Sequence, residues 1–529
     1  MRLMHTITAY ARTAALGIGL ACSCAAAADD PLWFEAGRPG DQAHQAVQLL
    51  GAAASHGLEP RDYNADALRQ AVAAAATRSA PLEAARVMRL DQALTDAMQR
   101  YLGDLHSGRV DPRQIHHNFR PARRDAFDAR SALHAALAAS RLPEAAAEAA
   151  PGLPLYGRLR EVLARYRAMD DAAWHEPLPS LPGGSPSRVG KLDPGQAYAG
   201  LAPLAQRLLA LGDLAPDAGP AMPLLRYEGV LVDAIKAFQQ RHGLVVDGVV
   251  GSATMAQLKV TPAARVRQIE LTLERLRWTP LMQGPRMIVV NIPEFVLRAY
   301  EVRDGRIAVI QEMKVIVGKA LDTRTPLFDE DMRFIEFSPY WNVPRSIARN
   351  EIVPRLRRDP GYFTREDFEF VARDGRVQSE LSPADLDAVL AGELRIRQRP
   401  GPRNALGDIK FVFPNHDAIF LHHTPATALF ARDRRDFSHG CIRVEEPVAL
   451  ATFVLGAMPD WPEDRIRQAM GTGRSQTLRL AEPVPVLIAY GTVLFKSGRV
   501  HFFDDLYGMD RVLDMALRRR LPIARQSLE

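Results

Sequence analysis

The chain has 529 residues, which is too long for a single hydrophobic core and predicts two to four domains. Its content of 47% hydrophobic and 24% charged residues is typical of a globular protein. A net charge of +5 over this length is small, so the composition gives no reason to expect a nucleic-acid partner.

The first 28 residues resemble a secretory signal peptide. Arg2 and Arg12 supply positive charge, residues 13–27 are mostly apolar, and small residues precede an Asp pair. The apolar stretch is short for a membrane span. We therefore expect an exported, periplasmic protein that is cleaved near residue 28, with lipid attachment at Cys22 as an alternative.

Residues 29–185 are predicted to form a helical scaffold domain. Ala, Leu, Arg and Glu dominate this region, and apolar residues recur at helical spacing, as in the stretch 94–101. No acid–base pair or ligand cluster stands out there. Residues 176–197 contain many Pro and Gly residues and are predicted to be a linker.

Residues 198–262 are predicted to form a small helical domain, which we call the module. A helix over 231–243 would bury apolar residues such as Ile235 and Phe238 on one face. A turn and a second short helix, 252–258, are expected to follow.

From residue 285 the chain is rich in β-forming residues. Short runs such as 287–292 and 313–317, separated by Gly or Pro, predict a mostly β domain over 285–465. A polar stretch, 345–405, interrupts it and is predicted to be a capping insertion. Strands and a helix in 466–529 are expected to complete the region. The predicted fold class is multidomain α+β, with a helical scaffold, a small helical domain and a mostly β domain that holds an inserted cap.

Cys441 is the only cysteine expected in the mature chain, because the other two lie in the leader. A lone thiol in an oxidising compartment has no internal disulfide partner, which favours a reactive role. Three histidines, His422, His423 and His439, lie within nineteen residues before it. A thiol becomes a good nucleophile as a thiolate, and an imidazole is the usual group that activates it.

His422 ends a predicted strand and is the candidate general base, while strand alternation turns His423 to the opposite side. The turn before Cys441 would expose the backbone N–H groups of Gly440 and Cys441 to an oxyanion. Two alternatives stay open. Cys441 is a small buried apolar residue in the first, and a zinc ligand together with His422 and His439 in the second.

The pattern around the cysteine resembles a known signature. His422 followed by Ser438-His439-Gly440-Cys441-Ile442-Arg443 is similar to the L,D-transpeptidases with a YkuD-type catalytic domain. Several other stretches resemble the large, multidomain YcbB-like subgroup, including Asn291-Ile292-Pro293, Val317-Gly318-Lys319 and Tyr340-Trp341-Asn342-Val343-Pro344. The module resembles a peptidoglycan-binding domain through residues that include Phe238, Gln239, Asp247 and Thr254.

The resemblance implies an activity. A periplasmic enzyme of this family forms 3→3 cross-links between meso-diaminopimelate residues of peptidoglycan tetrapeptide stems. Cys441 would attack the donor stem, release D-alanine and form a thioester that the amine of a second stem resolves. The resemblance also implies covalent inhibition by carbapenems, no metal or other cofactor, and penicillin-binding proteins as candidate partners.

The resemblance further implies roles for individual residues. His422 matches the base, His439 an orienting or lining residue, and Gly440 the residue that shapes the oxyanion turn. The expected substrate-binding residues are Arg443, Trp341, Tyr340 and Asn404. A structural salt bridge is the alternative for Arg443, and a place in the core is the alternative for Trp341.

Arginines of the capping insertion are expected to meet acidic stems, with a solvated charged face as the alternative. They are Arg395, Arg397, Arg399 and Arg403. Two other functions also stay open for the whole protein. One is an L,D-carboxypeptidase, which uses water in place of the acceptor amine, and the other is a non-catalytic scaffold that binds the cell wall.

Overall fold

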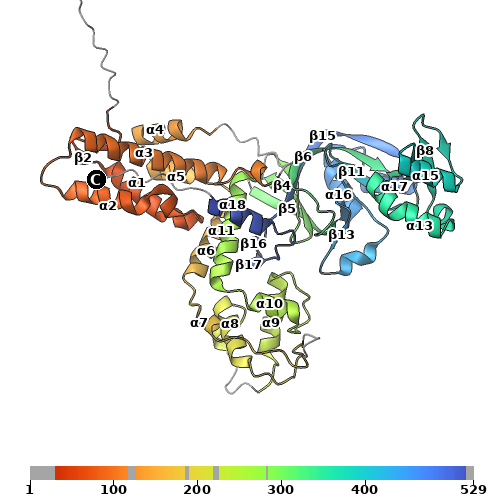
Figure 1. Cartoon of the computed structure of the whole chain (residues 1–529), viewed down its shortest axis with the longest axis horizontal. Helices are drawn as coiled ribbons and strands as arrows, with labels where there is room; N and C mark the ends of the chain where they lie inside the picture. Colours follow the sequence, from red (N-terminus) through yellow and green to blue (C-terminus); the bar gives the residue numbers. More distant parts are fainter. Residues whose placement is uncertain are drawn as a thin grey trace, which may run out of the picture.

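The computed structural model describes residues 30–116, 127–184, 190–218, 225–280, 284–304 and 306–519. The predicted leader, with Cys22, lies outside the described residues. Figure 1 shows three arms: a helical arm at the N-terminal end, a small helical arm, and a β-rich arm that ends in the cap. Within the described part of the chain, no helix combines the length and apolar character needed to span a membrane. The predicted fold class is confirmed.

The N-terminal arm is a helical bundle with its own apolar core. Its helices are α1 (Asp41–Gly51), α2 (Ala65–Thr77), α3 (Ala84–Ser107), α4 (Ala129–Ala138) and α5 (Leu142–Ala149). A short hairpin of β1 (Phe34–Glu35) and β2 (Arg38–Pro39) precedes them. The apolar spacing in 94–101 places Leu94, Met98 and Tyr101 in the core of α3, as the helical pattern predicted.

A separate core joins the arms, and it is built from segments far apart in the sequence. It contains α6 (Pro154–Arg167), α11 (Pro262–Trp278) and the hairpin of β16 (Val493–Lys496) and β17 (Arg499–Phe502). Arg277 is fully buried there, pairs with Glu274 at 2.7 Å and donates to the carbonyl of His56. The predicted scaffold region 29–185 therefore contributes to more than one core.

The C-terminal helix α18 (Met509–Arg519) lies between this central core and the β-rich arm. Its Asp514 pairs with Arg267 of α11 at 2.7 Å, whereas Leu513 and Leu517 pack in the core of the β-rich arm. Helix α18 therefore links the β-rich arm to the central core.

The module contains the two helices that the sequence predicted and a third before them. They are α8 (Leu201–Leu211), α9 (Val230–Arg241) and α10 (Ser252–Leu258), and the short α7 (Ala172–His175) precedes them. Ile235 and Phe238 are fully buried, as predicted. The prediction of a linker over 176–197 was wrong, because the leucines of this stretch belong to the module core. One of them, Leu192, also forms an isolated antiparallel β-bridge with Val250. These leucines are Leu178, Leu181 and Leu192.

The β-rich arm contains a sheet of nine strands in the order β13-β5-β14-β12-β11-β6-β15-β3-β4, and β4 also pairs with β5. The strands are β3 (Arg286–Asn291), β4 (Val296–Arg303), β5 (Arg306–Gly318), β6 (Phe328–Phe337), β11 (Ile409–Val412), β12 (Leu421–His422), β13 (Asp436–Ser438), β14 (Ile442–Val444) and β15 (Gln476–Ala489). Two helices, α16 (Pro447–Val454) and α17 (Glu463–Gly471), contribute to the same core. Strand β15 lies between β6 and β3, so the sheet depends on residues beyond 465.

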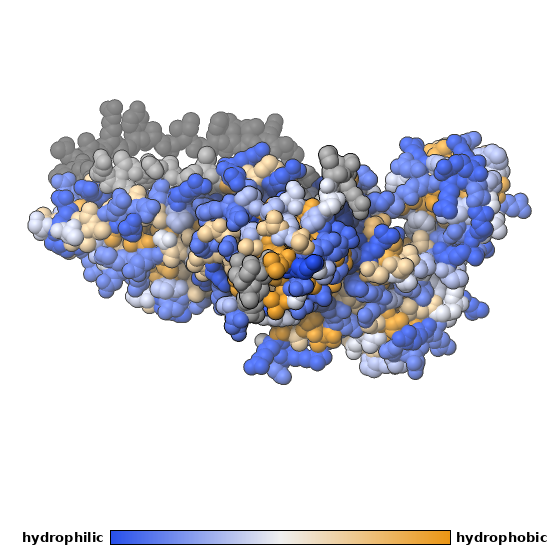
Figure 2. All heavy atoms as spheres, turned by 90° about the horizontal axis from the view of Figure 1, so that it is seen from below, coloured by the Kyte–Doolittle hydropathy of each residue, from blue (hydrophilic) through white to orange (hydrophobic). Residues whose placement is uncertain are grey.

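The cap (residues 341–405) has a small sheet and an apolar core of its own. Its sheet has the order β7-β10-β8-β9, with β7 (Trp341–Asn342), β8 (Phe368–Ala372), β9 (Val377–Gln378) and β10 (Leu394–Gln398). Its helices are α12 (Arg345–Ile347), α13 (Val353–Arg358), α14 (Gly361–Arg365) and α15 (Pro383–Ala391), with a π-helical turn at Ala348–Ile352. The end of the molecule that carries the cap in Figure 1 is mostly hydrophilic in Figure 2.

Candidate active site

Four polar side chains lie in a row across neighbouring strands of the main sheet. Glu336 on β6 is opposite Lys410 on β11, and Lys410 is opposite His422 on β12. His422 is in turn opposite Arg443 on β14. Residues directly opposite each other project on the same face of a sheet. The flanking residues of these strands point to the other face, into the core, and include Ile335, Phe411, Leu421 and Ile442.

Cys441 reaches the same face of the sheet. It precedes Arg443 by two residues, so strand alternation directs both side chains to the side of His422. The thiol is free and half-buried, and Sγ lies 3.8 Å from the carbonyl oxygen of Ala418. The structure therefore places the predicted nucleophile immediately before β14, the strand that pairs with the strand β12 of the predicted base.

Residues 438–441, which we call the catalytic turn, are held by internal hydrogen bonds. Gly440 has a φ of +113°, a value that L side chains rarely adopt, so glycine suits this position. Its N–H donates to Oγ of Ser438 at 3.1 Å, and that hydroxyl donates to the carbonyl of Cys441 at 2.5 Å. The expectation that the Gly440 N–H faces an oxyanion is therefore wrong for this structure, because that group is already bonded within the turn.

The segment after β5 supports the catalytic turn from outside. The hydroxyl of Thr325 donates to the carbonyl of Gly440 at 2.8 Å, and the hydroxyl of Thr323 donates to the carbonyl of Ser438 at 2.9 Å. Thr325 also accepts from the N–H of Gly318 at 2.9 Å. These contacts fix the backbone that carries Cys441.

The candidate base and nucleophile are both neutral at pH 7. Burial, followed by the charge of Arg443, lowers the pKa of His422 to about 3. Burial raises the pKa of the Cys441 thiol to about 11, although Lys410 and Arg443 oppose this shift. Nδ1 of His422 lies 2.5 Å from the carbonyl oxygen of His423. A carbonyl oxygen only accepts, so Nδ1 carries the proton and Nε2 is left as the basic nitrogen.

The other two histidines have partners away from Cys441. His439 is exposed, and its Nε2 lies 2.5 Å from Oε1 of Glu351 in the π-helical turn of the cap. Nδ1 of His423 lies 2.6 Å from Oδ1 of Asp408. Among the residues that the structure describes, no three His, Cys, Asp or Glu side chains are grouped as metal ligands would be.

Arg443 shares the face of the thiol without a carboxylate partner. It is half-buried, it makes no ion pair with any described residue, and its Nε is buried without a hydrogen-bond partner. The alternative of a structural salt bridge is therefore wrong for the described part of the chain. A half-buried guanidinium that has no carboxylate partner can bind the carboxylate of a substrate.

Two aromatic residues predicted to contact substrate lie at the base of the cap. The guanidinium of Arg397 stacks 4.1 Å from the ring centroid of Tyr340. Trp341 is half-buried and packs against the cap core, with its ring 6.4 Å from that of Phe368. Both side chains therefore contact residues of the cap.

The structure contradicts the predicted substrate contact of Asn404. Its side chain is 1% exposed and donates to the carbonyls of Pro339 at 3.0 Å and Arg399 at 2.9 Å. Its Oδ1 accepts from the N–H of Leu406 at 2.8 Å. Its side-chain amide is hydrogen-bonded to the backbone around the loop that returns from the cap to β11, so Asn404 is a structural residue.

The sequence pattern missed Lys410, Glu336 and Glu351. Lys410 pairs with Glu336 at 3.0 Å, and only the strand register places Lys410 directly beside His422. The alternation of polar and apolar residues in β6 and β11 was the one available signal, and it does not identify the strand partners.

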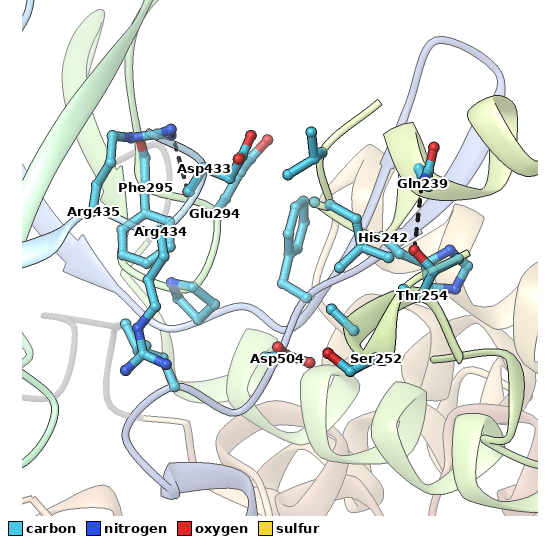
Figure 3. A pocket seen from close by; sticks show the side chains of 18 of the residues that line it. Gln239, His242, Ser252, Thr254, Glu294, Phe295, Asp433, Arg434, Arg435 and Asp504 are labelled. Atoms are coloured by element: carbon cyan, nitrogen blue, oxygen red, sulfur yellow. Dashed lines mark hydrogen bonds between the residues drawn. The ribbon is translucent and has the colours of Figure 1, made fainter. Parts of the chain in front are cut away.

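A cavity of about 730 Å³ lies between the module and the catalytic domain (Figure 3). The module side presents Gln239, His242, Ser252 and Thr254, and the opposite side presents Glu294, Phe295, Asp433, Arg434 and Arg435. Asp504 lies between the two sides. Arg435 is followed by β13, which leads into the catalytic turn.

Family models match three parts of the chain. The one described as "L,D-transpeptidase catalytic domain" matches residues 285–486, which include Cys441 and His422. The one described as "Scaffold domain" matches residues 25–163, and the one described as "Putative peptidoglycan binding domain" matches residues 201–258.

One similar protein agrees with the catalytic match. A curated protein of Haemophilus influenzae (strain ATCC 51907 / DSM 11121 / KW20 / Rd), named "Putative L,D-transpeptidase", is 32% identical over 253 residues, which are 47% of this chain and 49% of that protein. The chain therefore spans about half the length of this relative. The solved "Structure of Bdellovibrio bacteriovorus Bd1075" is 14% identical, covers 44% of this chain and 55% of that chain, and has a TM-score of 0.17, too low for a comparison of folds. The chain carries an L,D-transpeptidase catalytic domain of the YkuD family, together with a scaffold domain and a peptidoglycan-binding domain.

Proposed function

We propose that this protein is a periplasmic L,D-transpeptidase that forms 3→3 cross-links between meso-diaminopimelate residues of peptidoglycan. The observation that carries the proposal is the position of Cys441 immediately before β14, next to the paired strand β12 that ends at His422, inside the matched catalytic domain. The name of the Haemophilus relative and the peptidoglycan-binding module support the same substrate.

In the proposed first step, Nε2 of His422 removes the thiol proton while Sγ of Cys441 attacks a donor stem. The attacked atom is the carbonyl carbon of meso-diaminopimelate that is bonded to D-alanine. The C–N bond breaks, His422 returns the proton to the leaving amine, and a thioester remains. Because both groups start neutral, the proton moves during the attack, without a preformed ion pair.

In the second step, the side-chain amine of an acceptor stem attacks the thioester carbon. His422 takes a proton from this amine, the C–S bond breaks, and the proton returns to the Cys441 sulfur. The products are a new amide bond and the free enzyme. Arg443 is proposed to hold a stem carboxylate beside the reacting carbon.

The module is proposed to hold the wall polymer while the stem reaches the catalytic turn. Gln239, Asp247 and Thr254, which carry the resemblance to peptidoglycan-binding domains, line the cavity shared with the catalytic domain. The far wall of this cavity includes Arg435, which directly precedes β13, and β13 leads into the catalytic turn.

The test is the intact mass of the purified protein after incubation with a carbapenem, beside a Cys441→Ala variant. The proposal expects a single adduct on the wild type and none on the variant, with both proteins folded. Absence of an adduct on folded wild type would favour a non-catalytic wall-binding scaffold. Product analysis with tetrapeptide-bearing muropeptides, with and without an amine acceptor, separates cross-linking from L,D-carboxypeptidase activity.

A further inference from the structure

A cavity of about 410 Å³ opens in the cap, and three arginines line it. Arg345 and Arg349 come from the helical segment after β7, and Arg395 comes from β10. All three are exposed, and none makes an ion pair with a described residue. The rest of the lining is largely apolar and includes Val343, Ala348, Leu390, Leu394 and Ile396.

Most other arginines of the cap are neutralised by carboxylates of the cap itself. The pairs are Arg357 with Asp387, Arg365 with Asp359, Arg397 with Glu369, and both Arg399 and Arg403 with Asp367. Of the four arginines that the sequence suggested for acidic stems, only Arg395 is left without such a pair. Unpaired cations that share one concavity repel each other, and an anion placed among them would relieve this repulsion.

The cavity belongs to the part of the cap that contacts the catalytic turn. Arg349 lies two residues before Glu351, whose carboxylate contacts His439. The N–H of Val343 donates to the carbonyl of Ile396 at 3.0 Å, so the two walls of the cavity are joined by their backbones. The arginines are therefore carried by a firm element adjacent to the reaction site.

We propose that this cavity binds the carboxylate groups of an acidic peptide stem. The proposal rests on the proposed function for the identity of the stem. Guanidinium groups pair with carboxylates through two parallel hydrogen bonds, and the apolar lining would take the aliphatic part of the stem. Arg345, Arg349 and Arg395 thus determine specificity at a site separate from Cys441.

A binding measurement on protein that lacks the Cys441 thiol tests the cavity separately from the reaction. The free tetrapeptide stem is titrated calorimetrically into Cys441→Ala protein and into the same protein with Arg349→Gln and Arg395→Gln. Arg376→Gln is the matched control, because Arg376 is an exposed cap arginine outside the cavity that makes no ion pair with a described residue. We expect the double substitution to weaken binding by about tenfold or more, as loss of charged hydrogen bonds does, and to make binding less sensitive to salt. Equal affinities in the double variant and the control would overturn the proposal.

Two kinetic arms on protein with an intact thiol identify which stem occupies the cavity. Slower thioester formation with the tetrapeptide alone assigns it to the donor, and slower resolution of a preformed thioester by a second stem assigns it to the acceptor. If neither step changes, the cavity takes no part in the reaction and the proposal fails. Carbapenem labelling of the wild type reports on the proposed function separately. Loss of labelling in the wild type would end that function while leaving the binding result to decide on the cavity.

Discussion

Nε2 of His439 lies 2.5 Å from Oε1 of Glu351, and this contact joins the catalytic turn to the cap. Both side chains are partly exposed, so the pair is screened by solvent and contributes little to stability. His439 thus contacts the cap, and its expected role as an orienting or lining residue stays a prediction.

Removing this contact should loosen the cap without unfolding the protein. We expect Glu351→Ala to lower the free energy of unfolding by less than about 1 kcal/mol, because exposed ion pairs are weak. Amide hydrogen exchange in residues 348–358 should become faster. Glu393→Ala is the control, because Glu393 is an exposed cap glutamate whose side chain makes no ion pair with a described residue. The same exchange rates in both variants would show that the contact does not hold the cap.

The two adjacent histidines should differ strongly in their effect on acylation. His422 shares the face of Cys441, whereas His423 is bonded to Asp408. We expect His422→Ala to slow carbapenem acylation by about 10²–10⁴-fold, the usual contribution of a general base. His423→Ala should change the rate much less. Comparable losses in the two variants would contradict the assignment of His422.

The acylation rate should not fall near pH 6.5, where an ordinary histidine becomes protonated. With its pKa lowered to about 3, His422 keeps its basic form as the pH falls from 8 to 5. The Cys441 thiol, with its pKa raised to about 11, stays protonated over the same range. The acylation rate should therefore be nearly flat between pH 5 and 8 and should rise towards pH 11 as thiolate forms. A fall centred near pH 6.5 would mean that His422 titrates as an ordinary imidazole.

Thr325 should be needed for the geometry of the catalytic turn. Its buried hydroxyl bonds the N–H of Gly318 and the carbonyl of Gly440, and Thr325→Val would leave both without this partner. We expect a loss of about 1–3 kcal/mol in unfolding free energy, the cost of an unsatisfied buried group, and slower acylation. Thr325→Ser keeps the hydroxyl and should retain the acylation rate. Equal rates in the two variants would exclude a role for this hydroxyl in the turn.

Much of the architecture could be predicted because it depends on local patterns. The helical spacing in 94–101 and around Phe238 predicted the buried helix faces, and the β-rich run 287–292 predicted β3. The linker prediction over 176–197 failed for the same reason, since Pro and Gly dominate the local composition. The leucines of that stretch become buried only when the module folds back over them.

The sequence by itself determined the chemistry of the candidate site. The motif around His422 and Cys441 predicted a nucleophile and a base, since a motif records which residue types a short segment carries. Only the tertiary structure decided which groups surround them. Strand register placed Lys410 and Arg443 on either side of His422, and the cap brought Glu351 to His439. Burial made the pair neutral, because desolvation of a charge depends on atoms contributed by the whole fold and by no single segment.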